Sequence, residues 1–207
     1  EDEYFSDGIT EDIIAHLSKI ADLKVISRTS VMGYKGSGKK IREIGSELGV
    51  DMALFKMVDA INESRVRVFL EKVRKALWIL KGKTVGLLGL AFKPETDDIR
   101  EAPSIKIIGE LVKQGAALRL YDPKAADNMK SLYPEDGQSV TYVADPYEAA
   151  RGAHILLVVT EWEEIRKLDL ARVKSLMANP VLIDGRNVFD PAAVRALGFE
   201  YASIGRK

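Results

Sequence analysis

The sequence predicts an α/β protein with a doubly wound, parallel, six-stranded sheet, preceded by a long helix and a small α/β N-terminal segment. Three observations lead to this fold class. From Lys83 onward, short apolar runs alternate with helical stretches, and turns rich in Gly, Asp or Pro separate them. The apolar runs have the length of strands. Before this region, residues 51–80 contain no proline or glycine and have a helical period. Strands and helices that alternate at this spacing form a parallel sheet covered on both faces.

Residues 1–50 form the first of three predicted regions, before residues 51–80 and 81–207. Its expected elements are a helix over Ile9–Ile20, a short strand over Leu23–Ser27, a basic loop over Gly33–Lys40 and a helix over Ile41–Leu48. One strand and two helices are too few to bury a core of their own. This segment therefore docks on another part of the chain or is loosely ordered.

Residues 51–80 are expected to form one long amphipathic helix. Its apolar positions recur near the helical period: Leu54, Met57 or Val58, Ile61, Val66, Phe69 or Leu70, Val73 and Leu77. This stripe can pack on the α/β domain or on a second copy of the chain, and the length of the helix favours neither. A homodimer through this helix is one expectation.

Residues 81–207 carry the strands of the predicted sheet. The candidate strands are Thr84–Leu88, Ala117–Tyr121, Val140–Val143, Ile155–Val159, Val181–Asp184 and Tyr201–Ile204. Asp145-Pro146 and Asp190-Pro191 each offer a capping carboxylate followed by a proline at the first helical position. Gly115 and Gly198 stand where helices are expected to stop. This region is therefore predicted to be one doubly wound α/β domain.

Composition excludes several classes of function. Lys plus Arg (31) equal Asp plus Glu (31), so there is no basic excess for nucleic acid or for an anionic membrane. The apolar runs are too short to span a bilayer, so a cytoplasmic protein is expected. The absence of cysteine excludes disulfides, thiolate metal sites and a cysteine nucleophile. The chain begins at Glu1 without a methionine, which suggests a processed, truncated or assembled chain.

Isolated side chains receive ordinary structural interpretations. His16 and His154 have no carboxylate or second histidine at ligand spacing, so we expect packed or surface histidines and no metal site. Trp78 and Trp162 are expected in the core or at its rim. The acidic run in Glu161–Glu164 is interpreted as a solvated turn.

A glycine-containing loop follows the first predicted strand, at its carboxyl end. Such loops line the ligand crevice of open α/β sheets, and Lys93 adds a positive charge there. The spacing of Gly86, Gly89 and Ala91 does not satisfy the dinucleotide fingerprint G-x-G-x-x-G. A tight turn with close helix packing is the favoured interpretation of the glycine pair. Asp122 ends the second strand, but Pro123 follows it, so a turn explains it equally well.

Two further loops carry an arginine. Thr96–Ser104 can clamp an anion before a helix start, or can be a solvated loop with internal ion pairs, which is the favoured interpretation. Arg186, in Asp-Gly-Arg-Asn after the fifth strand, can bind a diphosphate bidentately, or can be a surface arginine paired with Asp184 or Asp190. Three loops on one edge of the sheet, each with one cation, together indicate an anion-binding crevice.

Five strings in the chain carry a family resemblance. They are LKGKTVGLLGLAFKPETDDIREAPS, YDPKA, VTYVADPYEAARGAHILLVVTEWEE, VLIDGRNVFDP and LGFEYASIGR, and INESRVRVFLEKVRKAL precedes them. In order and spacing they resemble the C-terminal, UDP-sugar-binding domain of the UDP-glucose 6-dehydrogenases, whose fold there is Rossmann-like. The match covers about three quarters of the chain. It places the chain among oxidoreductases of nucleotide-sugar metabolism.

The resemblance implies roles for four residues. Phe92 and Lys93 fall on a Phe-Lys pair that contacts the UDP-sugar, and Arg186 falls on another UDP-sugar contact. Arg100 falls on an arginine that reaches toward NAD bound to the other domain. The NAD-binding Rossmann domain and the segment with the reacting cysteine have no counterpart in this sequence. The chain alone is therefore expected to hold no catalytic residue, not to bind NAD, and not to oxidise UDP-glucose to UDP-glucuronate.

Residues 1–50 resemble a different family. YFSDGITEDIIAHLSKIADLKVISRTSVMGYKG, followed by IREIGSELGV, is similar to the start of TolB-type amino-terminal domains. A chimeric chain is the resulting hypothesis. Two alternatives to a UDP-sugar-binding domain stay open: a structural or dimerisation module with a vestigial crevice, and a chain that is active after assembly with a separate NAD-domain subunit.

Overall fold

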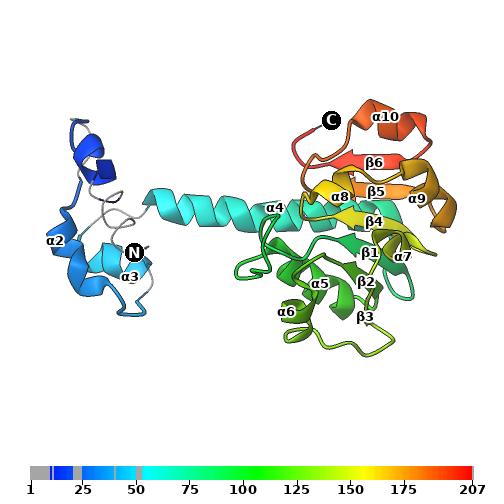
Figure 1. Cartoon of the computed structure of the whole chain (residues 1–207), viewed down its shortest axis with the longest axis horizontal. Helices are drawn as coiled ribbons and strands as arrows, with labels where there is room; N and C mark the ends of the chain where they lie inside the picture. Colours follow the sequence, from blue (N-terminus) through cyan, green and yellow to red (C-terminus); the bar gives the residue numbers. More distant parts are fainter. Residues whose placement is uncertain (1–9, 11, 21–24, 40, 50–52, 207) are drawn as a thin grey trace. The chain divides into compact units, whose positions relative to one another are not determined.

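The computed structural model describes residues 10, 12–20, 25–39, 41–49 and 53–206 (Figure 1). The chain divides into two compact units, Glu1–Asp59 and Ala60–Lys207. Among the described residues, no helix is both long enough and apolar enough to cross a membrane.

The described residues of the first unit before α4 form short helices and turns. Residues 12–17 are helical, and α2 (Arg28–Val31), the 3-10 helix η1 (Met32–Tyr34) and α3 (Ile41–Glu47) follow. The predicted strand Leu23–Ser27 is absent from its described part, residues 25–27, and its first two residues lie outside the described residues. Val25, Ile26 and Ser27 pair with no strand among the described residues, and a lone strand leaves its backbone groups without hydrogen bonds. The predicted basic loop Gly33–Lys40 begins inside η1.

The predicted long helix is α4, which runs from Ala53 to Leu77. Phe69, Leu70 and Val73 are buried in the core of the α/β domain. The apolar stripe therefore packs on the sheet domain over this part of the helix. Ile61, earlier in the same helix, is 48% exposed.

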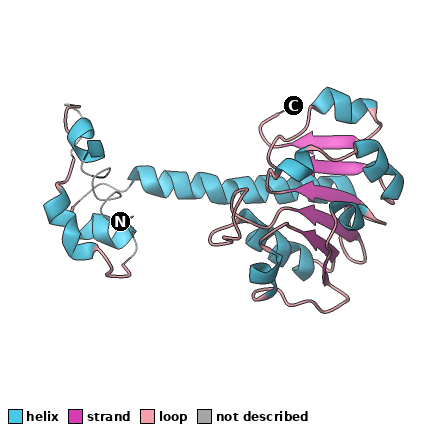
Figure 2. Cartoon of the chain, in the orientation of Figure 1, coloured by secondary structure: helices cyan, strands magenta, loops and turns pink. Residues whose placement is uncertain are grey.

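Six parallel strands form the sheet in the order β3-β2-β1-β4-β5-β6 (Figure 2, magenta). They are β1 (Thr84–Leu88), β2 (Ala117–Tyr121), β3 (Val140–Tyr142), β4 (Ile155–Val158), β5 (Val181–Asp184) and β6 (Glu200–Ser203). Val85 in β1 is in register with Leu118 of β2 on one side and with Ile155 of β4 on the other. The predicted strands are confirmed to within one residue at each end, and so is the doubly wound fold class.

Helices connect the strands, and their predicted start and stop signals are present. They are α5 (Pro103–Lys113), α6 (Ala126–Lys130), α7 (Pro146–Ala150), α8 (Glu163–Arg166), α9 (Leu170–Leu176) and α10 (Pro191–Ala196). Asp145 accepts a hydrogen bond from the Tyr147 amide at 2.7 Å, and Asp190 accepts one from the Ala193 amide at 2.8 Å. Gly115, just after α5, has a φ of +78°, a conformation that glycine adopts without strain.

The central strands are buried on both faces. Every residue of β4 and β5 is buried, although successive side chains point to opposite faces of the sheet. Helices therefore cover both sides of the sheet, which explains why these strands read as continuous apolar runs rather than alternating ones. Because all six strands are parallel, their carboxyl ends lie along one edge, where the predicted site residues follow β1 and β5.

Candidate functional site

The strand order places the candidate site at the centre of the sheet. β1 has β2 on one side and β4 on the other, so the direction of winding reverses between β1 and β4. Ligands of open α/β sheets bind outside the carboxyl ends of the strands at such a switch point. The loops there are residues 89–102 after β1, residues 159–162 after β4 and residues 185–190 after β5.

The two glycines of β1 and its loop allow close packing. A side chain at Gly86 would meet the backbone oxygen of Ala149 at 2.4 Å, in α7. At Gly89, where φ is +93°, it would meet Thr160 atoms at 2.5 Å. The favoured interpretation of the glycine pair, a tight turn with close helix packing, is therefore confirmed.

Asp122, at the carboxyl end of β2, is a buried structural anchor. Its Oδ2 accepts hydrogen bonds from the amides of Leu90 and Ala91 and from the indole nitrogen of Trp162. Its Oδ1 accepts two more, from the amides of Lys124 and Ala125. A dinucleotide-binding domain uses an acidic residue at this place for the ribose. Because protein donors occupy both oxygens of Asp122, this carboxylate is not available to a ribose hydroxyl.

Thr160, Glu161 and Trp162 connect the loop after β4 to the segments that follow β1, β2 and β5. The Thr160 hydroxyl donates to the carbonyl oxygen of Ala91, in the loop after β1, at 2.6 Å. Trp162 donates to Asp122 after β2, as described above, and Glu161 accepts from Arg186 after β5. Thr160 and Trp162 are buried. These three consecutive residues therefore fix the loops of the switch point relative to one another.

Arg186 forms a bidentate ion pair with Glu161. Its Nη2 donates to Glu161 Oε1 at 2.6 Å, and its Nε donates to Glu161 Oε2. The arginine side chain is 38% exposed and the glutamate side chain 22% exposed. The Arg186 guanidinium lowers the pKa of the Glu161 carboxyl below its usual range, although burial acts in the opposite direction. The predicted alternative partners of Arg186, Asp184 and Asp190, do not bind its guanidinium, and Glu161 is not part of a solvated turn.

Asp184, at the end of β5, holds the loop that carries Arg186 through hydrogen bonds. This fully buried carboxylate accepts hydrogen bonds from the amides of Arg186 (2.9 Å) and Phe189 (3.1 Å), and from the Tyr201 hydroxyl (2.9 Å). Helix α4 packs against the same loop, because a side chain at Gly185 would lie 3.0 Å from Phe69. Buried contacts therefore fix the backbone that carries Arg186.

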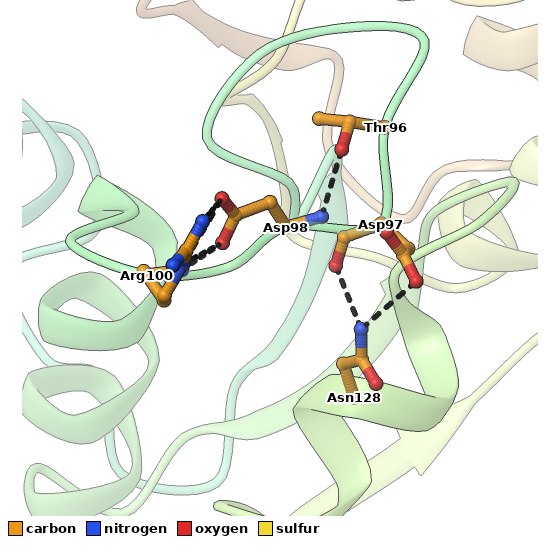
Figure 3. A network of polar contacts seen from close by, with 5 residues as sticks. All are labelled: Thr96, Asp97, Asp98, Arg100 and Asn128. Atoms are coloured by element: carbon orange, nitrogen blue, oxygen red, sulfur yellow. Dashed lines mark hydrogen bonds and ion pairs between the residues drawn. The ribbon is translucent and has the colours of Figure 1, made fainter. Parts of the chain in front are cut away.

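The second arginine, Arg100, has a local partner. Its Nε and Nη2 donate to the two carboxylate oxygens of Asp98, with Nε at 2.9 Å from Oδ1 and Nη2 at 2.7 Å from Oδ2 (Figure 3). The Arg100 side chain is 88% exposed. Its guanidinium lowers the pKa of the Asp98 carboxyl to about 2. The same loop contacts α6, where the Asn128 amide donates to Asp97 (Figure 3). The interpretation of this segment as a loop with internal ion pairs is confirmed.

Phe92 and Lys93 follow directly on the loop segment held by Thr160. The Phe92 amide donates to the Asp98 carbonyl oxygen at 2.9 Å, and its ring is 51% exposed. Lys93 is exposed. Among the described residues, no hydrogen bond or ion pair joins Lys93 to Arg186. The loops that carry them are connected indirectly, because Thr160 binds Ala91 and the adjacent Glu161 binds Arg186.

Other polar side chains have structural partners. His154 stands directly before β4, and its Nδ1 accepts from the Thr84 amide of β1 at 3.1 Å, which supports its interpretation as a packed histidine. Asn187, next to Arg186, has a φ of +57°, and its buried Oδ1 has no hydrogen-bond partner. Asparagine tolerates this conformation better than other non-glycine residues, and the Asn187 Nδ2 donates to the Ile204 carbonyl oxygen at 3.1 Å. Among the described residues there is no group of three potential metal ligands.

A separate groove lies between α4 and α5. Its volume is about 520 Å³, and Val66, Leu70, Ile105 and Tyr133 contribute to its wall. It contains none of the predicted site residues.

Comparison with known proteins places this geometry in a family. The UDP binding domain of the UDP-glucose/GDP-mannose dehydrogenase family matches residues 86–191. This range is half of the chain and includes Phe92, Lys93, Arg100 and Arg186. The chain belongs to the UDP-glucose/GDP-mannose dehydrogenase family. The predicted family resemblance is therefore confirmed.

Individual members of the UDP-glucose/GDP-mannose dehydrogenase family agree with this assignment. The chain is 34% identical to the UDP-glucose 6-dehydrogenase TuaD of Bacillus subtilis over 211 residues, and 38% identical to the UDP-glucose 6-dehydrogenase of Pseudomonas aeruginosa over 184 residues. These matches cover 96% and 84% of the chain, and 45% and 40% of the relatives. The chain thus spans less than half the length of these curated relatives.

A solved structure of this family has the same fold. It is a UDP-glucose dehydrogenase from the archaeon Pyrobaculum islandicum, which superimposes with a TM-score of 0.63 at 32% identity. The match covers 78% of this chain and 33% of that one.

Proposed function

We propose that residues 81–207 form a UDP-sugar-binding domain of the UDP-glucose 6-dehydrogenase type, with Lys93 and Arg186 as the cations that bind the diphosphate. The observation that carries this proposal is the placement of both residues on loops at the switch point, joined through Thr160 and Glu161. A diphosphate recognised by a lysine and a forked guanidinium receives charge-assisted hydrogen bonds from both. Phe92, half exposed beside Lys93, supplies an apolar surface for the nucleotide.

The chain is proposed not to carry out the oxidation by itself. Removal of a hydride from a sugar needs a bound acceptor, and the second oxidation step of this reaction type proceeds through a thiol adduct. The sequence has no cysteine, the glycines after β1 do not have the dinucleotide spacing, and protein donors occupy the Asp122 carboxylate that would bind a ribose. Arg100 is proposed to reach NAD held by a separate domain. NADH production from UDP-glucose and NAD by this chain alone contradicts the proposal.

Calorimetric titration of the chain with UDP tests the binding proposal. We expect a dissociation constant near the millimolar range, because one domain offers only one wall of the site. Lys93→Ala and Arg186→Ala should each weaken binding about tenfold, since loss of one charge-assisted contact costs about 1.5–3 kcal/mol. Arg100→Ala should leave binding unchanged. Lys167→Ala is the matched charge control, because this exposed lysine pairs with Glu163 instead.

Two results contradict the binding proposal. Equal UDP affinity in the wild-type chain, Lys93→Ala and Arg186→Ala places the site elsewhere. Absence of UDP binding favours the second candidate, a dimerisation module. The exposed apolar side chains Ile61 and Val68 on α4 favour that candidate. Light scattering that gives the mass of a dimer, and of a monomer for Ile61→Lys, supports it.

Residues 1–50 are proposed to contribute nothing to the UDP site, and their TolB-like origin stays a hypothesis. Ile13 and Leu17 in the helix over residues 12–17 are exposed, so few apolar contacts protect this helix. Hydrogen exchange should therefore be faster for its amides than for those of β4. Exchange as slow as in β4 contradicts the proposal and indicates a docked segment.

A further inference from the structure

We propose that Glu161 is a positioning residue that holds the Arg186 guanidinium in its binding orientation and remains paired with it when a nucleotide diphosphate binds. This inference rests on the proposed function. It concerns a residue that binds no ligand itself, and it follows from three features of the structure: the fixed position of Glu161, the edge of the guanidinium that it occupies, and the burial of the pair.

Glu161 is fixed from both sides along the chain. The side chain of Thr160, before it, donates to the Ala91 carbonyl oxygen, and the side chain of Trp162, after it, donates to Asp122. Both neighbours are buried. Two anchored neighbours leave the backbone at Glu161 little freedom, so its carboxylate provides a fixed acceptor rather than a mobile surface charge.

Glu161 occupies one edge of the Arg186 guanidinium and leaves the other open. A guanidinium has five N–H donors. Glu161 takes one from Nε and one from Nη2. The two donors of Nη1 have no partner among the described residues, and one of them forms, with the second donor of Nη2, an open edge for another anion. A diphosphate can therefore bind bidentately while the pair with Glu161 stays intact.

The burial of the pair decides against displacement of Glu161. Its side chain is only 22% exposed. If the diphosphate took the Nε–Nη2 edge, the largely buried Glu161 carboxylate would lose its partner. An unpaired buried charge has a high free-energy cost, so this displacement is unfavourable. Without Glu161, by contrast, the long arginine side chain is free to sample several rotamers, and ligand binding must then order it. Pairing before binding removes this entropic cost.

Calorimetry with UDP on the full chain provides the test. Glu161→Ala should weaken binding about fivefold to tenfold, because binding must then immobilise the arginine. Glu161→Gln keeps one acceptor oxygen and should restore part of the affinity. Glu163→Ala is the matched control. Glu163 lies two residues after Glu161 and carries the same charge, but it pairs with Lys167 instead of Arg186. It should bind UDP as the wild type does.

A double-mutant comparison separates positioning from general support of the fold. In the Arg186→Ala background, Glu161→Ala should cause no further loss, because Glu161 acts through the arginine alone. A further loss equal to that in the wild-type background contradicts the inference and assigns Glu161 a general structural role. Tighter binding by Glu161→Ala also contradicts it, because Glu161 is then a competitor of the ligand.

A measurement without ligand keeps this inference distinct from the proposed function. The Arg186 Nε–H resonance in the nuclear magnetic resonance spectrum should be protected from exchange in the wild-type chain and lose protection in Glu161→Ala. If the resonance is protected but the wild-type chain does not bind UDP, the proposed function is contradicted. The positioning role in UDP binding is then contradicted as well. UDP binding that Glu161→Ala leaves unchanged contradicts the positioning role alone.

Discussion

Arg186 and Arg100 form the same bidentate pair with a carboxylate, but in different surroundings. Arg100 pairs with Asp98 two residues away in the same loop, and its side chain is 88% exposed. Arg186 pairs with Glu161, which is 25 residues away and follows a different strand. Its side chain is 38% exposed. The first pair lies within one loop, whereas the second connects the loops that follow β4 and β5.

The difference shows that pair geometry alone does not define a functional arginine. An exposed ion pair contributes little to the free energy of folding, because water screens the attraction and solvates each partner well. A partly buried pair that joins separate elements restricts where the guanidinium can lie, and it rests here on the buried Asp184. The comparison is therefore consistent with the proposed role of Arg186 in binding within this domain and with the proposed role of Arg100 toward a separate domain.

The largest effect is expected at Asp184, beneath the Arg186 loop. Asp184→Ala removes the acceptor of three hydrogen bonds and leaves buried donors unsatisfied, so it should lower the free energy of unfolding by about 3 kcal/mol or more. Tyr201→Phe removes only one of these bonds and should cost about 1 kcal/mol. Urea denaturation measures both. Equal costs for the two variants contradict a central role for the carboxylate.

A smaller effect is expected for the two pairs themselves. Glu161→Ala should lower the free energy of unfolding by about 1 kcal/mol, because the pair is partly buried and solvent screens the rest. Asp98→Ala should cost less, since Arg100 remains solvated without it. The same urea experiment compares them. A larger cost for Asp98→Ala reverses the comparison between the two loops.

The smallest effect is the pH dependence of the Asp98 pair. The pKa of Asp98 is lowered to about 2 in the folded chain, so this pair contributes its stability above the ordinary pKa of aspartate. That contribution is lost as pH falls through about 2. Carboxyl chemical shifts should show the low midpoint in the wild type and a higher midpoint in Arg100→Ala. An unchanged midpoint in the variant excludes Arg100 as its cause.

The sequence predicted the sheet well because its strands are buried on both faces. Such strands are continuous apolar runs, and turn residues mark their ends, so β1, β2 and β5 have the predicted bounds. The predicted N-terminal strand was wrong over residues 25–27, which have no partner strand in the described part of the chain. A local run of apolar residues predicts an extended segment, but it does not predict whether another strand is available to pair with it.

The candidate site was predicted only in part for a related reason. Lys93 and Arg186 follow strands, so the topology places them at one edge. Glu161 stands in an acidic run that looks solvated, and its contact with Arg186 depends on how two loops meet. Asp122 likewise receives donors from residues 31 to 40 positions away in the chain. Contacts over such separations follow from the packed sheet and not from any local motif.

The central position of β1 has a consequence for synthesis on the ribosome. β1 and β2 can pair soon after they emerge, but β1 gains its second neighbour only when β4, from Ile155 onward, has been made. At roughly 5–20 residues per second, that interval is several seconds. During it, the unpaired N–H and C=O groups on one edge of β1 are open to solvent and to other chains. Nascent chains that end before β4 should therefore bind chaperones more strongly than chains that include it, which ribosome-associated pull-down at both lengths can measure.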